Sequence, residues 1–307
     1  MDNNEREYPL IQVYILTYNR PETVLKALDS VLKQTYPNVE LILSDNSTND
    51  KTFDLLRNRN DWGKYKYIRR RPSLPSTEHF NIVYNEISSD YYMVFHDDDE
   101  MLPNMVEKLY GALSSNTSFS AAGANAYITK NTKKRFAFPP KNELLMNGED
   151  LLRRYINNRI APFPSYMFRN KIMREIKPDY NNKGGKYCDV SYLYDIANCG
   201  PIIYVGEPLM IYNIHPGQDS GDFDFLMHIQ LTNYLKSKVS TKSLLNKYRL
   251  YNLYRNAVLG FRYSNIKWRP RIATLLLNYS AYDYFVKYVI RFVQSFCFTI
   301  SRSWKNR

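Results

Sequence analysis

The stretch YYMVFHDDDEMLP, residues 91–103, decides the fold class of this chain. Its first five residues are apolar or aromatic and are typical of a buried central strand. Three adjacent aspartates follow, and Pro103 then stands at a position that favours the first turn of a helix. The acidic run Asp97, Asp98 and Asp99 is therefore predicted to be held between a strand and a helix, at a fixed place in the fold.

The residues before this stretch alternate between strand and helix patterns. Strands are predicted at residues 10–17, 39–43 and 65–68, and helices at residues 21–34, 51–57 and 80–87. Such βαβαβ alternation is typical of an α/β fold with a mostly parallel sheet and helices on both faces. Ligands of such sheets bind beyond the carboxyl ends of the strands. The loops that follow the strands are therefore the predicted functional loops.

The residues after this stretch carry a weaker pattern. A helix is predicted at residues 104–113, a strand at residues 121–129, and a basic, mobile loop at residues 130–140 that closes over a substrate. Residues 164–215 carry short strands around one helix near residues 189–198. Beyond residue 219 the pattern becomes helical and rich in Tyr, Leu, Lys and Arg. We expect one large α/β domain at residues 1–218 and a basic, Tyr-rich helical extension at residues 219–307.

The net charge of +12 indicates attraction to polyanions such as nucleic acid, anionic lipid or phosphorylated small molecules. The sequence carries no zinc-finger, basic-zipper or RNA-binding pattern, so we expect no nucleic-acid partner. The three cysteines lack metal-type spacing and no secretory segment is recognisable, which favours a reduced, cytoplasmic protein. No uncharged apolar run approaches the roughly 20 residues that span a bilayer.

The C-terminal residues 271–307 interleave large apolar side chains with Lys and Arg. This pattern suits a helix that lies on an anionic membrane surface. A helix that packs on the catalytic domain and ends in a basic tail explains the pattern equally well. The Tyr-rich helices also allow an oligomer contact, and any membrane contact is expected to be peripheral.

The acidic run suits a divalent cation. Adjacent carboxylates repel each other, and a cation or hydrogen-bond donors relieve that repulsion. Mg²⁺ or Mn²⁺ typically takes one or two carboxylates and completes its shell with water and substrate phosphates. The alternative is a solvated acidic turn at the start of the next helix. The position after a buried strand favours the metal.

Three motifs in order resemble the family 2 glycosyltransferases of the GT-A fold. The first is VYILTYN at residues 13–19, followed by Arg20 and Pro21. The second is LILSDNS at residues 41–47, and the third is the acidic stretch at residues 91–103. The resemblance implies a Rossmann-like nucleotide-sugar-binding half at about residues 8–115 and an acceptor-binding part at about residues 116–218.

The resemblance also implies roles for single residues. Those expected at the nucleotide sugar are Thr17, Tyr18, Asn19 and Arg20 on the first loop, Asp45 at the base, and Asp97 and Asp98 at the ribose and diphosphate. For Asp45, spacing alone favours a turn-forming role. The family often has aspartate where His96 stands, and we favour Asp98 and Asp99 as metal ligands. His215 is a further candidate ligand, although a lone histidine is more often structural.

Two further elements concern catalysis and phosphate. Asp189, which precedes a predicted helix, stands where the family places its catalytic base after a glutamate; here Cys188 replaces that glutamate. Arg69, Arg70 and Arg71 precede the acidic strand. They suit a phosphate clamp in which Arg71 contacts the donor, although a solvated surface run is favoured slightly.

We therefore predict a glycosyltransferase that is metal-dependent and inverting. It moves a sugar from a nucleoside-diphosphate donor, UDP by family frequency, to a saccharide or lipid-linked acceptor in bacterial surface polysaccharide synthesis. One alternative is a nucleotidyltransferase, but the loop TYNRP at residues 17–21 lacks the glycines of a phosphate loop. The other is a module that binds nucleotides or polyanions without turnover.

Overall fold

The structure is a computed structural model that describes residues 8–130, 133–215, 218 and 224–263. The chain divides into two compact units. The first comprises Met1–Asp222 and Leu226–Leu231, and the second comprises Phe223–Phe225 and Thr232–Arg307. The predicted boundary near residue 218, with its division of binding roles, stays a prediction.

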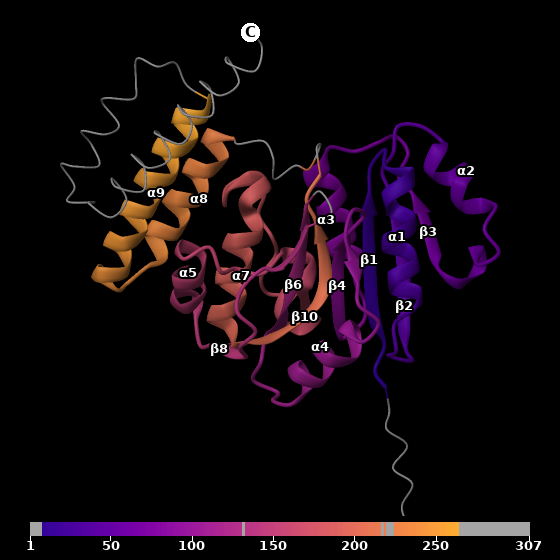
Figure 1. The fold of residues 1–307 in the computed structure, drawn as a ribbon, viewed down its shortest axis with the longest axis horizontal. Coiled ribbons are helices and arrows are strands. Elements are labelled where there is room, and N and C mark those ends of the chain that lie inside the picture. The colour runs from indigo at the N-terminus through magenta and orange to yellow at the C-terminus, as the bar shows by residue number, and fades with distance from the viewer. Residues whose placement is uncertain (1–7, 131–132, 216–217, 219–223, 264–307) are drawn as a thin grey trace, which may run out of the picture. The chain divides into compact units, whose positions relative to one another are not determined.

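The first unit is built on one sheet with the strand order β3-β2-β1-β4-β9-β6-β10-β5 (Figure 1). Its longer strands are β1 (Ile11–Thr17), β2 (Val39–Asp45), β3 (Lys66–Arg69), β4 (Tyr91–His96), β6 (Ala121–Lys130) and β10 (Ile202–Asn213). Strands β3, β2, β1 and β4 pair in parallel, and so do β6 and β10.

Short antiparallel strands complete the sheet. They are β5 (Glu100–Met101), β7 (Lys133–Phe136), β8 (Glu143–Leu145) and β9 (Tyr166–Arg169). Strand β9 lies between β4 and β6 and is antiparallel to both, so β4 and β6 point in the same direction. The longer strands thus share one direction, which confirms the predicted α/β class with a mostly parallel central sheet.

Helices connect these strands as the βαβαβ pattern predicts. They are α1 (Pro21–Leu32), α2 (Lys51–Arg57), α3 (Ser76–Glu86), α4 (Met105–Ser114), α5 (Gly148–Ile156), α6 (Asn170–Met173) and α7 (Cys188–Cys199). Helix α1 begins at Pro21, because the fixed φ of proline suits a first helical position and its missing N–H is not needed there. Val24, Leu28 and Val31 recur at helical spacing and are buried in the core.

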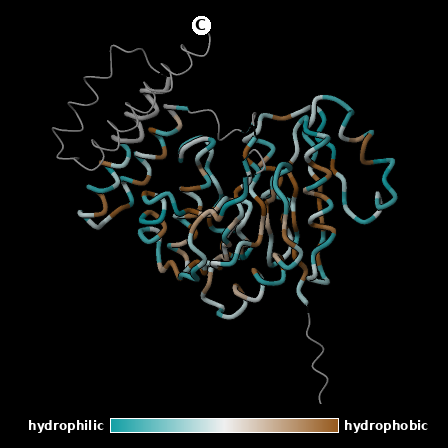
Figure 2. Tube along the Cα trace, viewed as in Figure 1, coloured by the Kyte–Doolittle hydropathy of each residue, from teal (hydrophilic) through white to brown (hydrophobic). Residues whose placement is uncertain are grey.

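The core is formed by the central parallel strands. All seven residues of β1 are buried, and Val13, Ile15 and Phe95 are fully inaccessible to solvent. Figure 2 shows the corresponding brown segments of β1 and β4 in the middle of the sheet. Burial of each such side chain stabilises the fold by about 1.5–3 kcal/mol. This packing fixes the strand ends, and with them the loops that follow.

Two local features differ from the sequence prediction. The basic segment at residues 130–140 is not simply a loop, because residues 133–136 form β7 and pair with β6 in an antiparallel hairpin. Charged strands of this kind are tolerated at a sheet edge, where side chains reach solvent. Helix α5 was not predicted, although its N-cap is a local signal: the side chain of Asn147 accepts a hydrogen bond from N of Asp150 at 3.1 Å.

The C-terminal part is helical where it is described, as predicted. It consists of α8 (Phe225–Lys238) and α9 (Lys242–Tyr263). In the second unit, Thr232 donates to Asn252 at 3.2 Å, and Leu235, Leu244 and Tyr248 are buried. Among the described residues no helix has the length and apolarity needed to cross a membrane. The predicted membrane-surface helix at residues 271–307 lies outside the described residues.

Candidate active site

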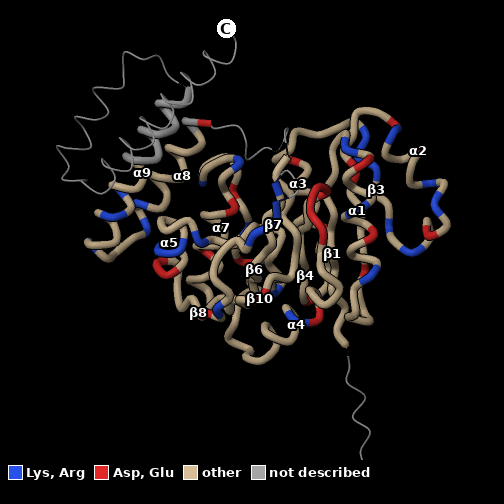
Figure 3. Tube along the Cα trace, in the orientation of Figure 1, with Lys and Arg blue, Asp and Glu red and all other residues tan. Residues whose placement is uncertain are grey.

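The polar side chains of the predicted site lie at the carboxyl ends of neighbouring strands. The parallel register sets Thr17 of β1 opposite Asp45 of β2, and Leu16 opposite His96 of β4. Figure 3 shows the acidic run as one continuous red segment beside β1. We call Thr17, Arg20, the acidic run, Asn213 and His215 the strand-end network, because hydrogen bonds join them. The loop after β1 and the acidic run therefore lie side by side, as predicted.

Asp97 is held by the loop after β1. Its carboxylate is 3% exposed, and it accepts a hydrogen bond from the Thr17 hydroxyl at 2.7 Å and one from Nη1 of Arg20 at 3.0 Å. Burial raises the pKa of Asp97, while Thr17 and Arg20 act in the opposite direction. Both contacts favour the ionised form and fix its orientation.

The Asp98 carboxylate contacts two side chains, the guanidinium of Arg20 and the imidazole of His215. Its Oδ2 lies 3.3 Å from Nη1 of Arg20 and 2.9 Å from Nε2 of His215. His215 comes from the segment after β10, 117 residues away in the sequence. The structure therefore places His215 beside the acidic run. A ligand of the predicted metal site, or a residue that supports such a ligand, would need this position.

Asp99 is the most enclosed of the three aspartates. It is 0% exposed, and its Oδ1 accepts a hydrogen bond from N of Asn213 at 3.0 Å. Its Oδ2 is buried and has no hydrogen-bond partner among the described residues. Burial raises the pKa of Asp99 well above its ordinary range, and the neighbouring Asp98 adds to the shift. A buried carboxylate oxygen without a donor is destabilising, and a bound cation removes that penalty.

His96 joins this group, although the sequence analysis did not select it as a ligand. His96, Asp98 and Asp99 each offer one ligand atom, and these atoms lie within 4.8 Å of one another. An imidazole with two carboxylates suits a divalent ion such as Mn²⁺. The position of His96 at the end of a buried strand, next to three aspartates, is the signal that identifies it.

Asp45 makes the turn that its spacing favours. It is 1% exposed, and its Oδ1 accepts a hydrogen bond from N of Ser47 at 2.8 Å. Its Oδ2 accepts one from the Tyr67 hydroxyl at 2.6 Å. Burial, followed by this hydrogen bond, raises the pKa of Tyr67. A carboxylate oxygen can accept two hydrogen bonds, so Asp45 retains acceptor capacity, and its contact with a base stays a prediction.

Asn19 joins the loop after β1 to the loop after β2. Its φ of +54° lies in the left-handed region that asparagine tolerates. Its backbone N donates a hydrogen bond to Oγ of Ser47 at 2.8 Å, and its side-chain Oδ1 accepts one from the backbone N of Thr48 at 3.0 Å. The neighbouring Tyr18 is 51% exposed and open to a ligand. Asn19 is therefore a positioning residue for both loops.

The three arginines at residues 69–71 all have carboxylate partners. Arg69 and Arg71 pair with Asp50, the latter at 2.7 Å, and Arg70 pairs with Glu86 at 2.6 Å. Arg69 and Arg70 are half-buried and Arg71 is exposed, and these ion pairs hold the run in place. Arg71 also donates to the carbonyl of Thr48 at 3.0 Å, and its role toward the donor stays a prediction.

A buried histidine, His79, contacts Ser44 near the carboxyl end of β2. Nε2 of His79 on α3 lies 2.7 Å from Oγ of Ser44 in β2, and Nε of Arg70 contacts the same hydroxyl at 3.0 Å. Burial and the nearby Arg70 lower the pKa of His79 to about 4. His79 is therefore neutral in the folded protein at pH 7. No sequence motif singled it out.

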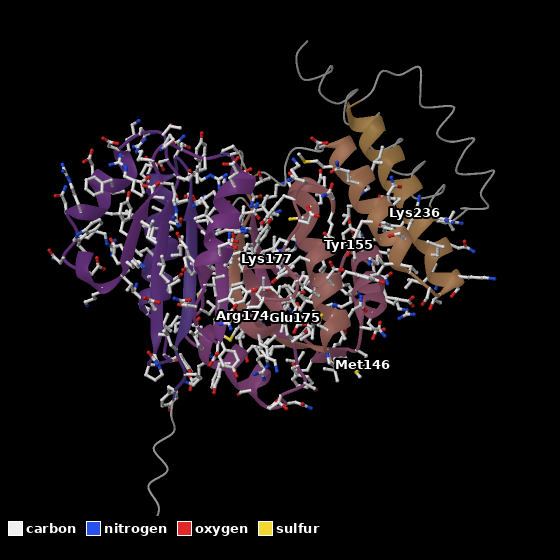
Figure 4. The ribbon with its side chains drawn as sticks, turned by 180° about the vertical axis from the view of Figure 1, so that it is seen from behind. Met146, Tyr155, Arg174, Glu175, Lys177 and Lys236 are labelled. Carbon is white, nitrogen blue, oxygen red and sulfur yellow. The ribbon has the colours of Figure 1, made fainter. Side chains whose placement is uncertain are left out.

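Asp189 lies in the first turn of α7 and is half-buried. Its Oδ1 accepts a hydrogen bond from N of Val190 at 2.9 Å. The segment that leads to α7 is anchored to α3, because Nζ of Lys177 donates to Asn85 at 2.6 Å; Lys177 is labelled in Figure 4. The hydrogen bond from Val190 orients the Asp189 carboxylate, and its role as base stays a prediction.

Comparison with known proteins agrees with this geometry. The sequence profile of "Glycosyl transferase family 2" matches residues 12–177, more than half of the chain. An uncharacterized glycosyltransferase of Haemophilus influenzae is 24% identical over 226 residues, which cover 70% of this chain and 69% of that protein. An uncharacterized glycosyltransferase of Methanocaldococcus jannaschii is 24% identical over 257 residues, 82% of each chain.

Solved structures share the fold. The crystal structure of S. aureus TarS 1–349 superposes with a TM-score of 0.64 at 12% identity, over 88% of this chain and 80% of that chain. This fold is of the GT-A type, as the three motifs predict. The chain is thus a glycosyltransferase and belongs to glycosyl transferase family 2.

Proposed function

We propose that this enzyme transfers a sugar from a nucleoside-diphosphate donor, with UDP as the nucleotide, to a saccharide or lipid-linked acceptor in surface polysaccharide synthesis. The observation that carries the proposal is the buried Oδ2 of Asp99, which lies beside Asp98 and His96 and has no hydrogen-bond partner in the described part of the chain. This arrangement suits a divalent cation, which the diphosphate of such a donor needs.

Proteins of similar fold or sequence support the choice of substrates. TarS has been solved in complex with UDP-GlcNAc (TM-score 0.63, 12% identity) and a mannosyltransferase of Pyrobaculum calidifontis with GDP-Man and Mn²⁺ (TM-score 0.53, 14% identity). A GalNAc(5)-diNAcBac-PP-undecaprenol beta-1,3-glucosyltransferase of Campylobacter jejuni is 23% identical over 173 residues, 54% of this chain.

Asp98 and Asp99 would hold the cation, with His96 or His215 as a nitrogen ligand. Mn²⁺ and Mg²⁺ both fit such ligands, and the imidazole favours Mn²⁺. When bound, the cation would offset the negative charge that accumulates on the leaving nucleoside diphosphate. The buried position of Asp99 strengthens this interaction, because water does not screen it.

The chain's own side chains would bind and orient the donor. Asp97, fixed by Thr17 and Arg20, accepts hydrogen bonds from the ribose hydroxyls. The Arg20 guanidinium lies beside both carboxylates and can also donate to a phosphate oxygen. Asp45 and the exposed Tyr18 bind the nucleobase, one by hydrogen bonding and the other by stacking.

Asp189 would act on the acceptor. An inverting transfer needs a base that removes the proton of the attacking hydroxyl while the bond from the anomeric carbon to the diphosphate breaks. The new glycosidic bond forms, the nucleoside diphosphate leaves, and the proton passes to the Asp189 carboxylate. The anchored first turn of α7 gives this carboxylate a defined position.

Thermal unfolding with nucleoside diphosphates tests the donor site. UDP, GDP and CDP are each added with and without Mn²⁺, to the natural protein and to the Asp99→Asn variant. We expect UDP with Mn²⁺ to stabilise the natural protein by about 2.7 kcal/mol at a hundred times its dissociation constant. Asp99→Asn should lose the dependence on Mn²⁺, because the amide is a poor ligand for the cation.

Asp99→Asn is also expected to melt at the same or a higher temperature than the natural protein when no ligand is present. Burial raises the pKa of Asp99, so its ionisation destabilises the metal-free fold as the pH rises above the unfolded pKa. The matched control is Asp54→Asn, an exposed carboxylate that contacts only Arg57 at 3.1 Å among the ion pairs of the described residues. A shift that persists in Asp99→Asn, or no shift with any nucleotide, overturns the proposal.

A further inference from the structure

The hairpin of β6 and β7 carries a strongly cationic groove. The groove has a volume of about 640 Å³ and is lined by Ile128, Lys130, Lys133, Lys134, Arg135 and Ile214. Figure 3 shows blue Lys and Arg segments around the label of β7. We call this feature the hairpin groove.

The strand register concentrates positive charge on one face of the hairpin. Lys130 is directly opposite Lys133, and Arg135 is directly opposite Ile128, two residues along β6. Directly opposite residues point to the same face, and positions two apart on one strand share that face. Like charges in such a pair repel and destabilise the hairpin. A bound anion would relieve this repulsion.

The four cations of the hairpin groove are Lys130, Lys133, Lys134 and Arg135. In the part of the chain that the structure describes, none of them forms an ion pair with a carboxylate. Nζ of Lys134 lies 3.8 Å from the ring centroid of Tyr127, a contact that leaves its charge uncompensated. By contrast, Arg20, Arg70 and Arg71 each pair with a carboxylate of the same domain.

The hairpin groove adjoins the candidate active site. N of Ile214, which lines the groove, donates to the carbonyl of Thr129 at 2.9 Å. The preceding residue, Asn213, donates to Asp99, and the following residue, His215, contacts Asp98 at 2.9 Å. Three consecutive residues thus connect the groove to the acidic run.

We propose that the hairpin groove binds a phosphate or diphosphate group of the acceptor. This inference rests on the proposed function and adds to it the chemical class of the acceptor. In the proposed function a cation held by the acidic run would neutralise the diphosphate of the donor, so the cations of the groove remain for a second anionic group. A neutral saccharide offers no charge that would match Lys130, Lys133 and Arg135.

Binding of simple diphosphates tests this site without turnover. Isothermal titration calorimetry measures inorganic pyrophosphate, farnesyl diphosphate and farnesol in the presence of EDTA, so that the acidic run holds no metal. The variant is Lys130→Glu combined with Lys133→Glu, which keeps two like charges opposite each other and so preserves the repulsion within the hairpin. We expect both diphosphates to bind the natural protein and to bind this variant at least tenfold more weakly.

The matched control is Lys26→Glu combined with Lys33→Glu, two exposed lysines of α1 and its C-cap. It changes the net charge equally and should bind both diphosphates within twofold of the natural protein. Equal weakening in both variants would mean that only net charge matters, which overturns the inference. Equal affinity of the natural protein for farnesol and farnesyl diphosphate overturns it as well, because the groove would then not recognise phosphate.

Two further measurements are needed. One distinguishes a diphosphate from a membrane surface as the ligand of the groove, and the other distinguishes this inference from the proposed function. Loss of binding to phosphatidylglycerol vesicles in the hairpin variant, with unchanged binding of both diphosphates, would identify a membrane surface and overturn the inference. The shift with UDP and Mn²⁺ should persist in the hairpin variant. Its loss there would assign the groove to the donor, and its absence in the natural protein would contradict the proposed function itself.

Discussion

The strand-end network and the hairpin groove lie beside the same segment at the end of β10, but their charges are arranged in opposite ways. In the network, Asp97 and Asp98 are paired with Arg20, Thr17 or His215, whereas the buried Oδ2 of Asp99 lacks a hydrogen-bond partner among the described residues. In the groove, Lys130 and Lys133 face each other without a carboxylate. Charge paired within the chain fixes geometry, whereas unpaired charge is available to a ligand.

The largest effect is expected in the strand-end network. Asp98→Asn removes the carboxylate that Arg20 and His215 share and that helps to hold the cation. We expect kcat/KM for sugar transfer to fall about 10³-fold, because the charge on the leaving diphosphate is no longer offset. Steady-state kinetics with a UDP-sugar and Mn²⁺ measure the loss.

Asp54→Asn is the control for this loss and should keep the activity of the natural protein, since its carboxylate is exposed on α2. The double substitution in the hairpin groove should instead raise KM for a phosphate-bearing acceptor and leave KM for the donor unchanged. An Asp98→Asn enzyme with more than a tenth of the natural activity would show that the network orients the chain and does not take part in catalysis.

His79, which contacts Ser44 near the end of the neighbouring strand β2, provides a smaller effect, on stability. Its pKa of about 4 in the folded protein lies below the ordinary value near 6.5. The unfolded chain therefore binds a proton that the folded protein does not. The resulting stability is fully present above pH 6.5 and is lost as the pH falls toward 4. The shift corresponds to about 3 kcal/mol.

Urea unfolding at pH 7 and at pH 4.5 measures this contribution. The natural protein should lose about 2 kcal/mol more than His79→Leu between these two values. Asp97 and Asp99 oppose this trend, because burial raises their pKa values and their ionisation destabilises the fold as the pH rises. They are present in both proteins, so the difference isolates His79. Parallel pH profiles for the two proteins would contradict the assignment.

The sequence was sufficient to predict the strand-end network in outline. Thr17 and Asp97 follow buried parallel strands, and parallel strands present their carboxyl ends at one edge. The order of elements therefore brought these residues together without any knowledge of distances. Asn213 was not predicted, because its contact with Asp99 joins positions 114 residues apart and depends on the register of β10 with β5.

The hairpin groove shows the limit of local patterns. Residues 130–140 were predicted to be a loop because the segment is basic and contains prolines. Pairing with β6, which a single segment does not encode, determined the outcome. The like-charged pair of Lys130 and Lys133 became visible only with this register. The sequence analysis identified the segment as basic but did not predict that it pairs with β6.

The smallest predicted effect tests that pair directly. Lys130→Glu turns the repulsive cross-strand pair with Lys133 into an attractive one, and we expect about 0.5 kcal/mol of added stability. For a domain of this size that raises the melting temperature by about 1–2 °C. The gain should shrink at high salt, because exposed charges are screened within about 10 Å at 0.1 M salt.

Lys66→Glu is the control, since Lys66 is an exposed strand residue that faces Ile42 across β3 and β2. It should give no comparable gain. If Lys130→Glu is no more stable than the natural protein at low salt, the two lysines do not repel each other in the folded state. The hairpin would then carry no electrostatic strain for an anion to relieve, and the difference in charge pairing between groove and network would lose its energetic basis.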